Sequence, residues 1–505
     1  MSHIYINTEP SDDILDVLSF NKKIIDLHVG ESTNIKIFYD HKEWQDEPFM
    51  HDDKSSLYIA GWFLFKGRKN DISGFKSFLD DNIESCIKEK NYSVLNSKVN
   101  AGVFTAIYFY ENRVYIISDP FSLSSHYYSL DYPVRLSPYP SLIGGNDYND
   151  IFDKILNLQG HLFGKYTAFN DVFRIIPGDV IEISNEKLLV HEHKFLLEDD
   201  IVVPQDIPKE IEKLTSCWEK ENLSLALSAG FDSRLIATTC KPHLTYTWGP
   251  KSSLDRRVGA KLAKNLCSKH MEFLFKANRA SILEENICEQ LFSGCVKAYN
   301  PQFLANYKYV NSKSSINHVA LDGYLGDVLQ RGVYLYPSSY KGEFLKLFPN
   351  ALDKQTSTKE ILRTRYKNLD ESLFLILYED FLLKTNHLHN IEPNNKVTFY
   401  EFIYGRGLRY ITTGALVMNS LFKTVVPCFA HRVIFSSLIR NETKQIANYT
   451  IFNKIWSNVE APYCDYISEG FYSPKTNVNI IPILNLFGRI CTNKIPILYN
   501  YTREK

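Results

Sequence analysis

A short polar turn between an apolar strand and a helix carries the residues best suited to chemistry. Residues 223–239 read LSLALSAGFDSRLIATT, in which alternating apolar positions predict a buried strand. A turn of small residues follows, and then apolar residues that predict the start of a helix. Because the first N–H groups of a helix lack partners and the helix dipole is positive there, this turn can hold a phosphate. The hydroxyls of Ser228 and Ser233 add donors, and Asp232 can hold a magnesium ion against the phosphate oxygens.

The same turn resembles a known nucleotide-binding loop. It is similar to the pyrophosphate loop, usually Ser-Gly-Gly-x-Asp-Ser, of the ATP pyrophosphatase superfamily, and specifically of the asparagine synthetase B family. Ala229 stands where the family usually has Gly. Ala is the smallest substitute and keeps the backbone close to the ligand if its φ is negative. The resemblance implies ATP as the cofactor, with the ends of the first two strands framing the adenine. The residues expected to contact the nucleotide are Leu227, Ser228, Ala229, Gly230, Asp232, Ser233, Thr247 and Gly323.

A second strand end, within residues 316–327, carries another carboxylate. The sequence INHVALDGYLGD is a β-branched apolar run that ends in a turn punctuated by glycine. It is similar to the family's Gly-x-Gly-x-Asp segment, whose Asp is the second magnesium ligand, and the resemblance implies that role for Asp327. Carboxylates on adjacent strand ends can hold Mg²⁺ on ATP phosphates while the ion keeps several waters. The pair of Asp232 and Asp327 is therefore a far more specific signal than either residue alone.

Tyr324, three residues before Asp327, has two interpretations. Asparagine-forming members of the family have Glu at this position. The β-lactam and carbapenam synthetase branch has Tyr in a Gly-Tyr-x-x-Asp string, where it helps to deprotonate an amine nucleophile. A Tyr near two metal ions and a Lys could have its pKa lowered enough for that role. The alternative is that Tyr324 is an aromatic wall of the pocket.

The family closes its active site with a loop like Arg-x-Lys-x-Gly-Phe, whose Lys neutralises charge that develops on the acyl-adenylate and pyrophosphate. The counterpart here, residues 466–471, reads YISEGF and has Ser468 where the Lys belongs. Lys475, just beyond this loop, could substitute for it if the loop folds back. A string that resembles the family's Pro-Phe-Leu-Asp also departs from it, because Ala430 replaces the Asp.

Three arginines near these motifs leave two roles open. Arg331, four residues after Asp327, could reach phosphate or substrate, or could be solvated. Arg406 and Arg409 could clamp a substrate carboxylate or phosphate bidentately. For Arg406 and Arg409, the more ordinary role is that of an exposed charge on a helix.

The elements around these motifs predict a doubly wound α/β domain. After the first turn, residues 244–249 predict a second strand and residues 253–255 cap a helix. Residues 270–274 predict a third strand. Alternating strands and helices of this kind form a parallel sheet whose ligands bind at the carboxyl ends of the strands. Residues from about 355 to 460 predict helices.

The first part of the chain predicts short strands and turns with one or two helices. The strands are expected at 57–65, 103–110, 114–118 and 180–183, and an amphipathic helix at 72–89. Three strings in this part, at 115–121, 126–128 and 174–178, look like segments of the same family's amidotransferase-like domain. The resemblance implies a sandwich of two sheets between helices, of the N-terminal-nucleophile type. We expect this domain at 1–195, a linker at 196–222, and the synthetase-like domain at 223–505.

The glutamine-hydrolysing chemistry of the family is absent from this sequence. Family members that hydrolyse glutamine use a Cys directly after the initiator Met, because its thiolate attacks the amide. This chain has Ser2 there, and its first Cys is Cys86. Ser2 could be a nucleophile after Met removal, but a small residue that permits Met excision is the more frequent case. The sequence therefore predicts a degenerate amidotransferase-like domain that is a relic or a platform for substrate.

Composition narrows the function classes further. The chain has 505 residues, 44% of them hydrophobic and 23% charged, with a net charge of −1. A near-neutral chain gives no support for nucleic-acid binding. The nine Cys are scattered without a CxxC pair, which favours a reducing compartment over disulfides or a zinc site. With neither a signal peptide nor an apolar run long enough to span a bilayer, we expect a soluble cytoplasmic protein without membrane association. The sequence leaves a homodimer open.

Together the motifs predict an ATP-dependent ligase. It would adenylate a small-molecule, sugar-acid or peptide carboxylate, release pyrophosphate, and transfer the acyl group to an amine or ammonia to form an amide. Without its own glutaminase, it would act in glycan or natural-product biosynthesis. The alternatives are a nucleotide-binding member of the family that has lost turnover, suggested by Ser468 and Ala430, and a different adenylating enzyme for thiolation or RNA modification.

Overall fold

The structure is a computed structural model, and the chain divides into two compact units. The residues described are 3–7, 23–29, 33–39, 43–44, 46–130, 134–184, 187–195, 197, 203–266, 268–297, 299–314, 316–460, 463–468 and 470–494. The first unit comprises Met1–Leu197, Ile282–Pro301 and Ile403–Val425, and the second comprises Glu198–Ser281, Gln302–Phe402 and Val426–Lys505. Two segments that the sequence assigned to the domain at 223–505, namely 282–301 and 403–425, thus pack within the first unit. Ser2 lies outside the described residues.

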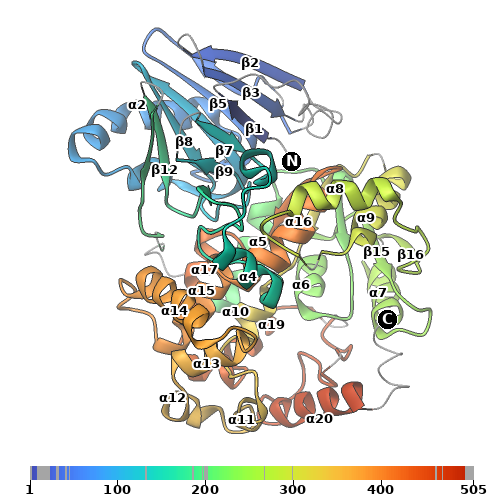
Figure 1. Ribbon diagram of the computed structural model, residues 1–505. Coiled ribbons are helices and arrows are strands. Elements are labelled where there is room, and N and C mark those ends of the chain that lie inside the picture. Colours follow the sequence, from blue (N-terminus) through green and yellow to red (C-terminus); the bar gives the residue numbers. More distant parts are fainter. Residues whose placement is uncertain are drawn as a thin grey trace. The chain divides into compact units, whose positions relative to one another are not determined.

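The first unit contains two antiparallel sheets (Figure 1). One sheet has the order β11-β9-β10-β1-β3-β2, with β1 (His3–Asn7), β2 (Lys23–Val29), β3 (Thr33–Tyr39), β9 (Tyr127–Ser129), β10 (Arg135–Ser137) and β11 (Val172–Arg174). The other has the order β13-β12-β8-β7-β5-β4, with β4 (Phe49–His51), β5 (Ser55–Phe65), β7 (Val99–Tyr110), β8 (Arg113–Ser118), β12 (Val180–Ser184) and β13 (Lys187–His191), and β6 (Arg68–Lys69) pairs with β5. Ile4 and Ile37 of the first sheet share a buried core with Ile107 and Ile116 of the second. The two sheets therefore pack face to face.

Helices cover the outer faces of this pair of sheets. The predicted amphipathic helix is α2 (Ile72–Glu89), begun by Asp71, whose side chain accepts a hydrogen bond from the Gly74 N–H. Its side chains Phe75, Leu79 and Ile83 are fully buried against the outer face of the β5 sheet. On the other sheet, α3 (Ser141–Gly144) packs on β9 and β10. The predicted sandwich of two sheets between helices is confirmed.

Four further helical segments belong to the first unit. They are α4 (Asp150–Gln159), α8 (Ile282–Phe292), the π-helical segment η6 (Gly407–Thr412) and α16 (Thr413–Ser420). Segment η6 runs directly into α16, and α16 contacts α8. Helix α4 lies within the predicted first domain, whereas α8, η6 and α16 come from distant parts of the chain, so the sequence gave no sign that these three pack with the first unit.

The second unit is built on a parallel sheet with the order β16-β15-β14-β17-β18. Its strands are β14 (Leu223–Ala226), β15 (Leu244–Trp248), β16 (Lys269–Phe273), β17 (Val319–Asp322) and β18 (Thr424–Pro427). Strand β14 pairs in parallel with both β15 and β17. The chain therefore winds outward on either side of β14, which confirms the predicted doubly wound arrangement. The carboxyl ends of β14 and β17 lie side by side.

Helices of the second unit surround this sheet (Figure 1). Those next to the candidate site are α6 (Phe231–Cys240), α7 (Leu254–Asn265), α9 (Pro301–Lys313) and α10 (Gly326–Arg331). The others are α11 (Tyr340–Leu345), α12 (Leu352–Gln355), α13 (Thr358–Arg365), α14 (Glu371–Thr385), α15 (Pro393–Ile403), α17 (Arg432–Ile439), α18 (Thr443–Ala447), α19 (Thr450–Trp456) and α20 (Ile481–Lys494). Among the described residues, no helix has the length and apolar character that crossing a membrane requires.

Part of the predicted linker at 196–222 is a structural helix of the second unit. Residues Ile207–Thr215 form α5, which packs on α6. Ile207 and Ile211 are fully buried, and the Thr215 hydroxyl donates to the sulfur of Cys240 at 3.2 Å. The burial of its apolar side shows that α5 belongs to the folded unit and does not merely connect domains.

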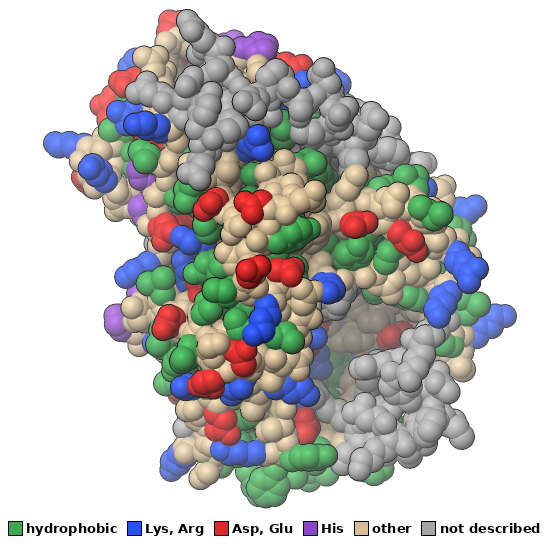
Figure 2. Space-filling view, viewed as in Figure 1, with side chains coloured by type: hydrophobic (Ala, Val, Ile, Leu, Met, Phe, Trp, Pro, Cys, Tyr) green, Lys and Arg blue, Asp and Glu red, His purple; other side chains and the backbone are tan. Residues whose placement is uncertain are grey.

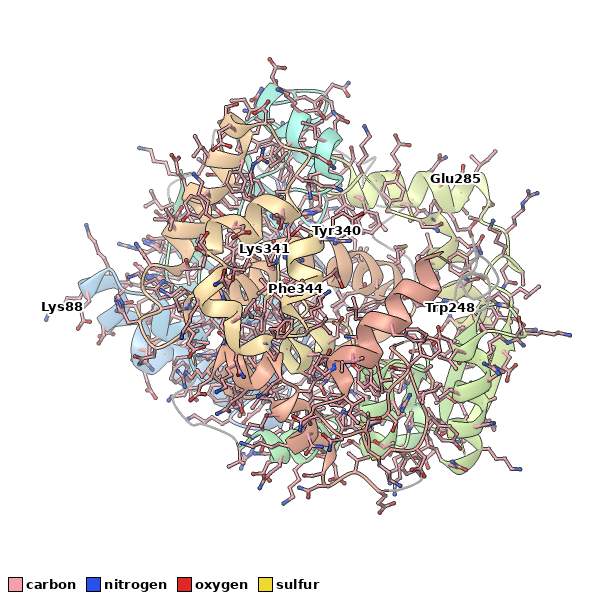
Figure 3. All side chains as sticks on the ribbon, turned by 90° about the horizontal axis from the view of Figure 1, so that it is seen from below. Lys88, Trp248, Glu285, Tyr340, Lys341 and Phe344 are labelled. Atoms are coloured by element: carbon pink, nitrogen blue, oxygen red, sulfur yellow. The ribbon has the colours of Figure 1, made fainter. Side chains whose placement is uncertain are left out.

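The surface carries both signs of charge. On the face in Figure 2, Lys and Arg side chains alternate with Asp and Glu without a field of one sign, as expected from the net charge of −1. The most exposed aromatic side chains lie on α11, where Tyr340 and Phe344 project from one short helix together with Lys341 (Figure 3).

Candidate nucleotide site

The turn between β14 and α6 is held by its own two serines. The Ser228 N–H donates to the Ser233 hydroxyl oxygen at 3.2 Å, and the two hydroxyl oxygens lie 3.1 Å apart. The Gly230 N–H donates to the Ser228 hydroxyl at 3.0 Å. Gly230 caps α6 without a side-chain hydrogen bond. The serines therefore first shape the turn, and the helix end is left without a side-chain cap.

Three N–H groups at the start of α6 have no hydrogen-bond partner within the described part of the chain. The first backbone bond into the helix runs from the Arg234 N–H to the Gly230 carbonyl at 3.4 Å. No hydrogen bond formed within the described part of the chain uses the N–H of Phe231, Asp232 or Ser233. Free N–H groups at a helix start, with the positive end of the helix dipole, form an anion site. This geometry fits the phosphate expected from the sequence.

Ala229 meets the condition that its position in the turn requires. It is not among the described residues with a positive φ, so the methyl group causes no backbone strain. Its N–H donates at 2.7 Å to a carboxylate oxygen of Asp255, in the first turn of α7. This contact was not foreseen from the sequence, because Ala229 lies in the turn before α6 and Asp255 lies 26 positions further along, at the start of α7. It ties the phosphate turn to the start of the next helix.

The carboxylates of Asp232 and Asp327 are close together. Asp232 Oδ2 accepts a hydrogen bond from the Asp327 N–H at 3.0 Å, and Asp232 Oδ1 accepts one from the Gln330 side-chain amide at 3.1 Å. Arg331 Nη2 lies 3.9 Å from an oxygen of each carboxylate. The two acids, which come from adjacent strand ends, thus converge on one cation. Among the described residues, no cluster of three or more Asp, Glu, His or Cys side chains could hold a metal ion.

Arg331 is fixed on three sides. Besides the two carboxylates, its Nη1 donates to the Tyr472 hydroxyl at 3.3 Å, and its guanidinium carbon lies 5.2 Å from the centre of the Phe231 ring. Only 21% of its side chain is exposed, so Arg331 is a site residue and not a solvated one. Burial, reinforced by the charge of Asp327, raises the pKa of Asp232, and the charge of Arg331 opposes this rise.

Two glycines explain how the strand ends approach so closely. A Cβ on Gly323 would lie 3.2 Å from the Asp232 carbonyl carbon and the Ser233 nitrogen. A Cβ on Gly326 would lie 2.7 Å from the Asp232 carboxyl group. The contact at Gly326 is closer than a side chain tolerates, and the one at Gly323 would require its neighbours to shift by a few tenths of an ångström. The glycines therefore let the β17 turn lie directly against the start of α6.

Tyr324 and Asp322 form a second polar group beside this turn. The Tyr324 N–H donates to Asp322 Oδ1 at 2.7 Å, and the Tyr324 and Tyr307 side chains are hydrogen-bonded. Burial and the Asp322 charge raise the pKa of Tyr324. The lowered pKa that the sequence suggested depends on metal ions beside Tyr324, and that role stays a prediction. Burial also raises the pKa of Asp322 to about 7, a feature that the sequence did not single out.

The loop that would carry the family's lysine is anchored without one. Ser468 is buried in a tight turn, where its N–H donates to the Tyr472 carbonyl at 3.0 Å. Lys475 is more than half exposed and pairs with Asp465 at 2.5 Å. Lys475 thus has a carboxylate partner within its own loop, whereas the cation that faces Asp232 is Arg331.

Arg234 connects this loop to the phosphate turn. It is fully buried, and it donates from Nη1 to the Tyr466 carbonyl at 2.6 Å and from Nη2 to the Ala229 carbonyl at 2.5 Å. Its guanidinium also lies 5.0 Å from the Phe231 ring, on which Tyr472 packs at 5.1 Å. Burial lowers the pKa of Arg234 to about 10, so it stays charged at neutral pH. The sequence did not predict that Arg234 links the loop at 466–471 to the phosphate turn.

The strand ends expected to frame adenine are tightly bonded to each other. The Leu227 N–H donates to the Tyr246 carbonyl at 2.8 Å, and the Thr247 hydroxyl donates to the Leu227 carbonyl. Gly259 of α7 packs closely against Thr247, since a Cβ at Gly259 would lie 2.6 Å from the Thr247 hydroxyl oxygen. Contact of Leu227 and Thr247 with adenine stays a prediction.

Arg409 does not have the exposed position that its helix suggested. It belongs to the first unit, where it is buried and donates to the carbonyls of Gly164 and Tyr166. Arg406 is exposed in the same segment. The exposed helix charge predicted as the more ordinary role is therefore wrong for Arg409, and the bidentate clamp on a substrate stays a prediction for this pair.

Similarity between this chain and known proteins is found at the level of structure and not of sequence. No family model and no curated protein matches the chain. Solved structures that are similar to it include those of two enzymes. One is the glutamine phosphoribosylpyrophosphate amidotransferase from B. subtilis complexed with ADP and GMP, at 10% identity, covering 58% of this chain and 94% of that chain with a TM-score of 0.25. The other is described as the allosteric regulatory enzyme of purine biosynthesis, at 9% identity, covering 58% and 91% with a TM-score of 0.24. Superpositions at these scores carry no argument about function.

Proposed function

We propose that the protein is an ATP-dependent ligase that adenylates a carboxylate and passes the acyl group to an amine or ammonia. One observation carries the proposal. The carboxylates of Asp232 and Asp327 converge on one cationic position, directly beside three free N–H groups at the start of α6. A cation held by two carboxylates next to an anion site is the arrangement that binds a nucleoside triphosphate together with its metal ion.

The residues fit a magnesium ion bound together with ATP. Mg²⁺ in such sites is usually held by one or two carboxylates, with phosphate oxygens and waters completing its shell. When bound, the ion supplies charge that stabilises pyrophosphate as a leaving group. Asp232 and Asp327 would hold it, since both already lie 3.9 Å from the single cationic group of Arg331. The N–H groups of Phe231, Asp232 and Ser233 would hold the phosphate oxygens.

Arginines would do the work for which the family uses a loop lysine. Arg331 is next to both carboxylates, and Arg234 holds the backbone of the phosphate turn. Positive charge fixed at this point stabilises the anionic transition state of adenylation. In this proposal Arg331 turns toward the phosphates when the carboxylates receive another cation, while Arg234 keeps the turn in shape.

The acceptor side of the reaction would use the pair of Asp322 and Tyr324. An amine must lose a proton when it attacks the acyl-adenylate, and a base with a pKa near neutrality suits that step. Asp322, whose pKa burial raises to about 7, is such a base. Tyr324 would bind the substrate as a hydrogen-bonding wall, since its raised pKa keeps the hydroxyl protonated.

A second candidate is a nucleotide-binding protein without turnover. The ion pair of Lys475 with Asp465 and the buried Ser468 favour it, because the loop contributes no free cation. It shares the nucleotide site with the ligase and differs only in the chemistry that follows.

Oxygen transfer separates the two candidates. Protein is incubated with MgATP and a panel of carboxylic acids that contain ¹⁸O in the carboxyl group, with hydroxylamine as a general amine acceptor. The ligase transfers one ¹⁸O to AMP and releases pyrophosphate with at least one acid. MgATP binding without AMP from any acid supports the binding protein, whereas formation of ADP and phosphate contradicts both.

A further inference from the structure

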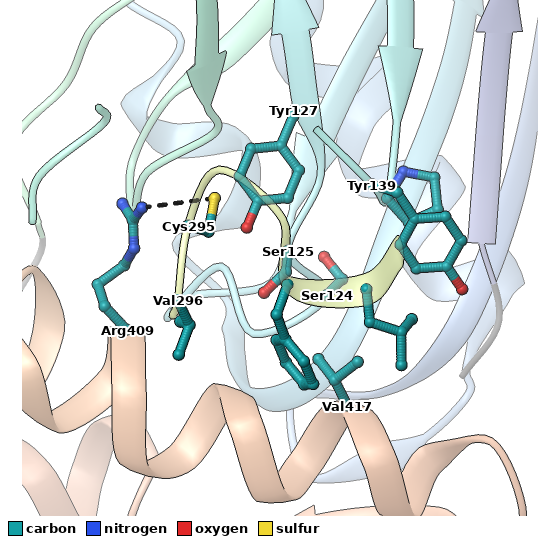
Figure 4. A pocket seen from close by; sticks show the side chains of 11 residues that line it. Ser124, Ser125, Tyr127, Tyr139, Cys295, Val296, Arg409 and Val417 are labelled. Atoms are coloured by element: carbon teal, nitrogen blue, oxygen red, sulfur yellow. Dashed lines mark hydrogen bonds between the residues drawn. The ribbon is translucent and has the colours of Figure 1, made fainter. Parts of the chain in front are cut away.

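A small cavity in the first unit is bordered by buried positive charge. Its lining residues come from four stretches of the chain, and the polar members are Ser124, Ser125, Tyr127, Tyr139, Cys295 and Arg409. Figure 4 shows the Arg409 guanidinium beside the Cys295 sulfur, with the Tyr127 hydroxyl turned toward the same end. The space open to the centre of a water-sized sphere inside the cavity is about 10 Å³, which is enough for one small ion. None of these residues belongs to the second unit, so the cavity is separate from the nucleotide site.

Two arginines next to this cavity are almost completely buried. Arg174 and Arg409 are each 2% exposed, and neither forms an ion pair with a carboxylate in the described part of the chain. Arg174 Nη2 donates at 3.0 Å to the hydroxyl of Ser125, which lines the cavity. Buried charges are normally paired, because an unpaired charge in a protein interior is costly. Two cations at one place therefore call for a counter-ion.

One buried carboxylate that acts on Arg174, that of Asp119, is already bonded to other groups. Asp119 is fully buried, and its carboxylate accepts the N–H groups of Phe121, Leu123 and Ser124 at 2.9–3.1 Å. It acts on Arg174 only at a distance, while Arg409 repels Arg174 more strongly; burial and this repulsion lower the pKa of Arg174 to about 10. The surroundings therefore keep a net positive charge at neutral pH.

The donors of the two guanidinium groups are only half used. A guanidinium has five N–H donors. Arg174 donates to the Ser122 carbonyl and the Ser125 hydroxyl, and Arg409 donates to the Gly164 and Tyr166 carbonyls and to the Cys295 sulfur. The remaining donors have no partner in the described part of the chain. The backbone at Arg409 is also unusual, since it lies in a π-helical segment, a conformation that occurs frequently at functional sites.

We propose that this cavity binds a single small monovalent anion of about the size of chloride, held by Arg409 at its polar end with Arg174 behind Ser125. The size of the cavity excludes phosphate, sulfate and carboxylates, whereas chloride is only slightly larger than a water molecule. Its negative charge balances the two arginines, so the bound anion stabilises the first unit. The site is independent of the nucleotide chemistry of the second unit.

Thermal unfolding of the full chain tests the site. The midpoint is measured in sodium chloride and in sodium gluconate at equal ionic strength, because gluconate is too large to enter. At about ten times its Kd, chloride should raise the midpoint by about 3 °C. Arg409→Met should abolish this difference, and Arg406→Met, which removes an exposed cation from the same segment, should keep it. Equal midpoints of the wild type in the two salts, or a chloride effect that persists in Arg409→Met, would overturn the proposal.

A direct observation covers the case in which Arg409→Met does not fold. Crystals of the wild-type protein soaked in sodium bromide should show an anomalous scattering peak inside the cavity, in contact with the Arg409 guanidinium. A cavity that holds only water, with no anomalous peak at any bromide concentration, would overturn the proposal regardless of the variant's behaviour.

Discussion

Replacement of Arg331 by Met should destabilise the second unit, and more strongly at pH 8 than at pH 5. Met keeps most of the apolar stem that packs against Phe231, but it removes the charge that lies 3.9 Å from both Asp232 and Asp327. It also removes the hydrogen bond to the Tyr472 hydroxyl. The variant therefore leaves two neighbouring carboxylates with no cation between them.

The size of the effect follows from this geometry. At about 4 Å, one pair of unit charges attracts by about 4 kcal/mol in a medium of effective dielectric constant near 20. The side chains of Asp232 and Asp327 are 18% and 36% exposed, so solvent screens part of this attraction. Breaking a fully buried ion pair costs about 3–5 kcal/mol. After the screening, we expect a loss of about 2–3 kcal/mol in the free energy of unfolding at pH 8.

The pH dependence has a definite sign. Burial raises the pKa of Asp232, and Arg331 holds it down, so removal of Arg331 raises the folded-state pKa further. A carboxyl with a raised folded-state pKa binds its proton more tightly in the folded state, and stability falls as the pH rises through that pKa. At pH 5 the Asp232 carboxyl of the variant is protonated. The defect should therefore be small at pH 5 and fully present at pH 8.

Urea unfolding at the two pH values measures this difference. Adding Asp232→Asn to the Arg331→Met variant should recover part of the lost stability at pH 8, because it removes one of the two unpaired charges. Lys475→Met is the matched control, since it removes an exposed lysine whose ion pair should contribute less than about 1 kcal/mol. Equal losses at pH 5 and pH 8, or an Asp232→Asn substitution that deepens the loss, would refute the reasoning.

Two further variants test the packing and the ionisation of the site. Gly326→Ala would put a methyl group 2.7 Å from the Asp232 carboxyl, so urea unfolding should show a loss of about 1–3 kcal/mol in the free energy of unfolding. Gly414→Ala is the control, because nothing lies within 4 Å of its Cβ, and it should show no such loss. An equal effect of the two alanines would rule out the close approach. Burial raises the pKa of Asp322 to about 7, so the wild type loses stability as the pH rises from 5 to 8. The amide oxygen of Asp322→Asn can still accept the Tyr324 N–H, and the side chain no longer ionises. The variant should therefore gain about 1–2 kcal/mol of stability relative to the wild type between pH 5 and pH 8. A difference between the two proteins that stays constant over this range would contradict the raised pKa.

Local patterns predicted the elements of the fold well. The helix expected at 72–89 has those bounds because its apolar spacing and the Asp71 cap act within the segment itself. The strand, turn and helix at 223–239 followed from the same kind of signal, and so did the second carboxylate at Asp327. The approach of Asp232 to Asp327 was predictable because parallel strands bring their carboxyl ends to one edge of a sheet.

Contacts between distant segments were not predictable in this way. Arg331 looked equally suited to solvent, because only the packing of Phe231 and Tyr472 around it decides its position. The 282–301 and 403–425 segments belong to the first unit, although the sequence placed them with the second, since helical periodicity does not tell which surface a helix covers. Burial and the Asp322 charge raise the pKa of Tyr324, and its burial depends on contacts with another segment, such as the one with Tyr307, that the motif does not show.

Calorimetric titration with MgATP tests the central claim most directly. The wild type should bind the nucleotide, and the Asp232→Asn, Asp327→Asn double variant should bind it at least about tenfold more weakly, because both carboxylates that would hold the cation are neutralised. Asp206→Asn, which removes an acid from the second unit outside the site, should leave the affinity unchanged. The account is contradicted if the wild type does not bind MgATP, or if the double variant binds it as tightly as the wild type.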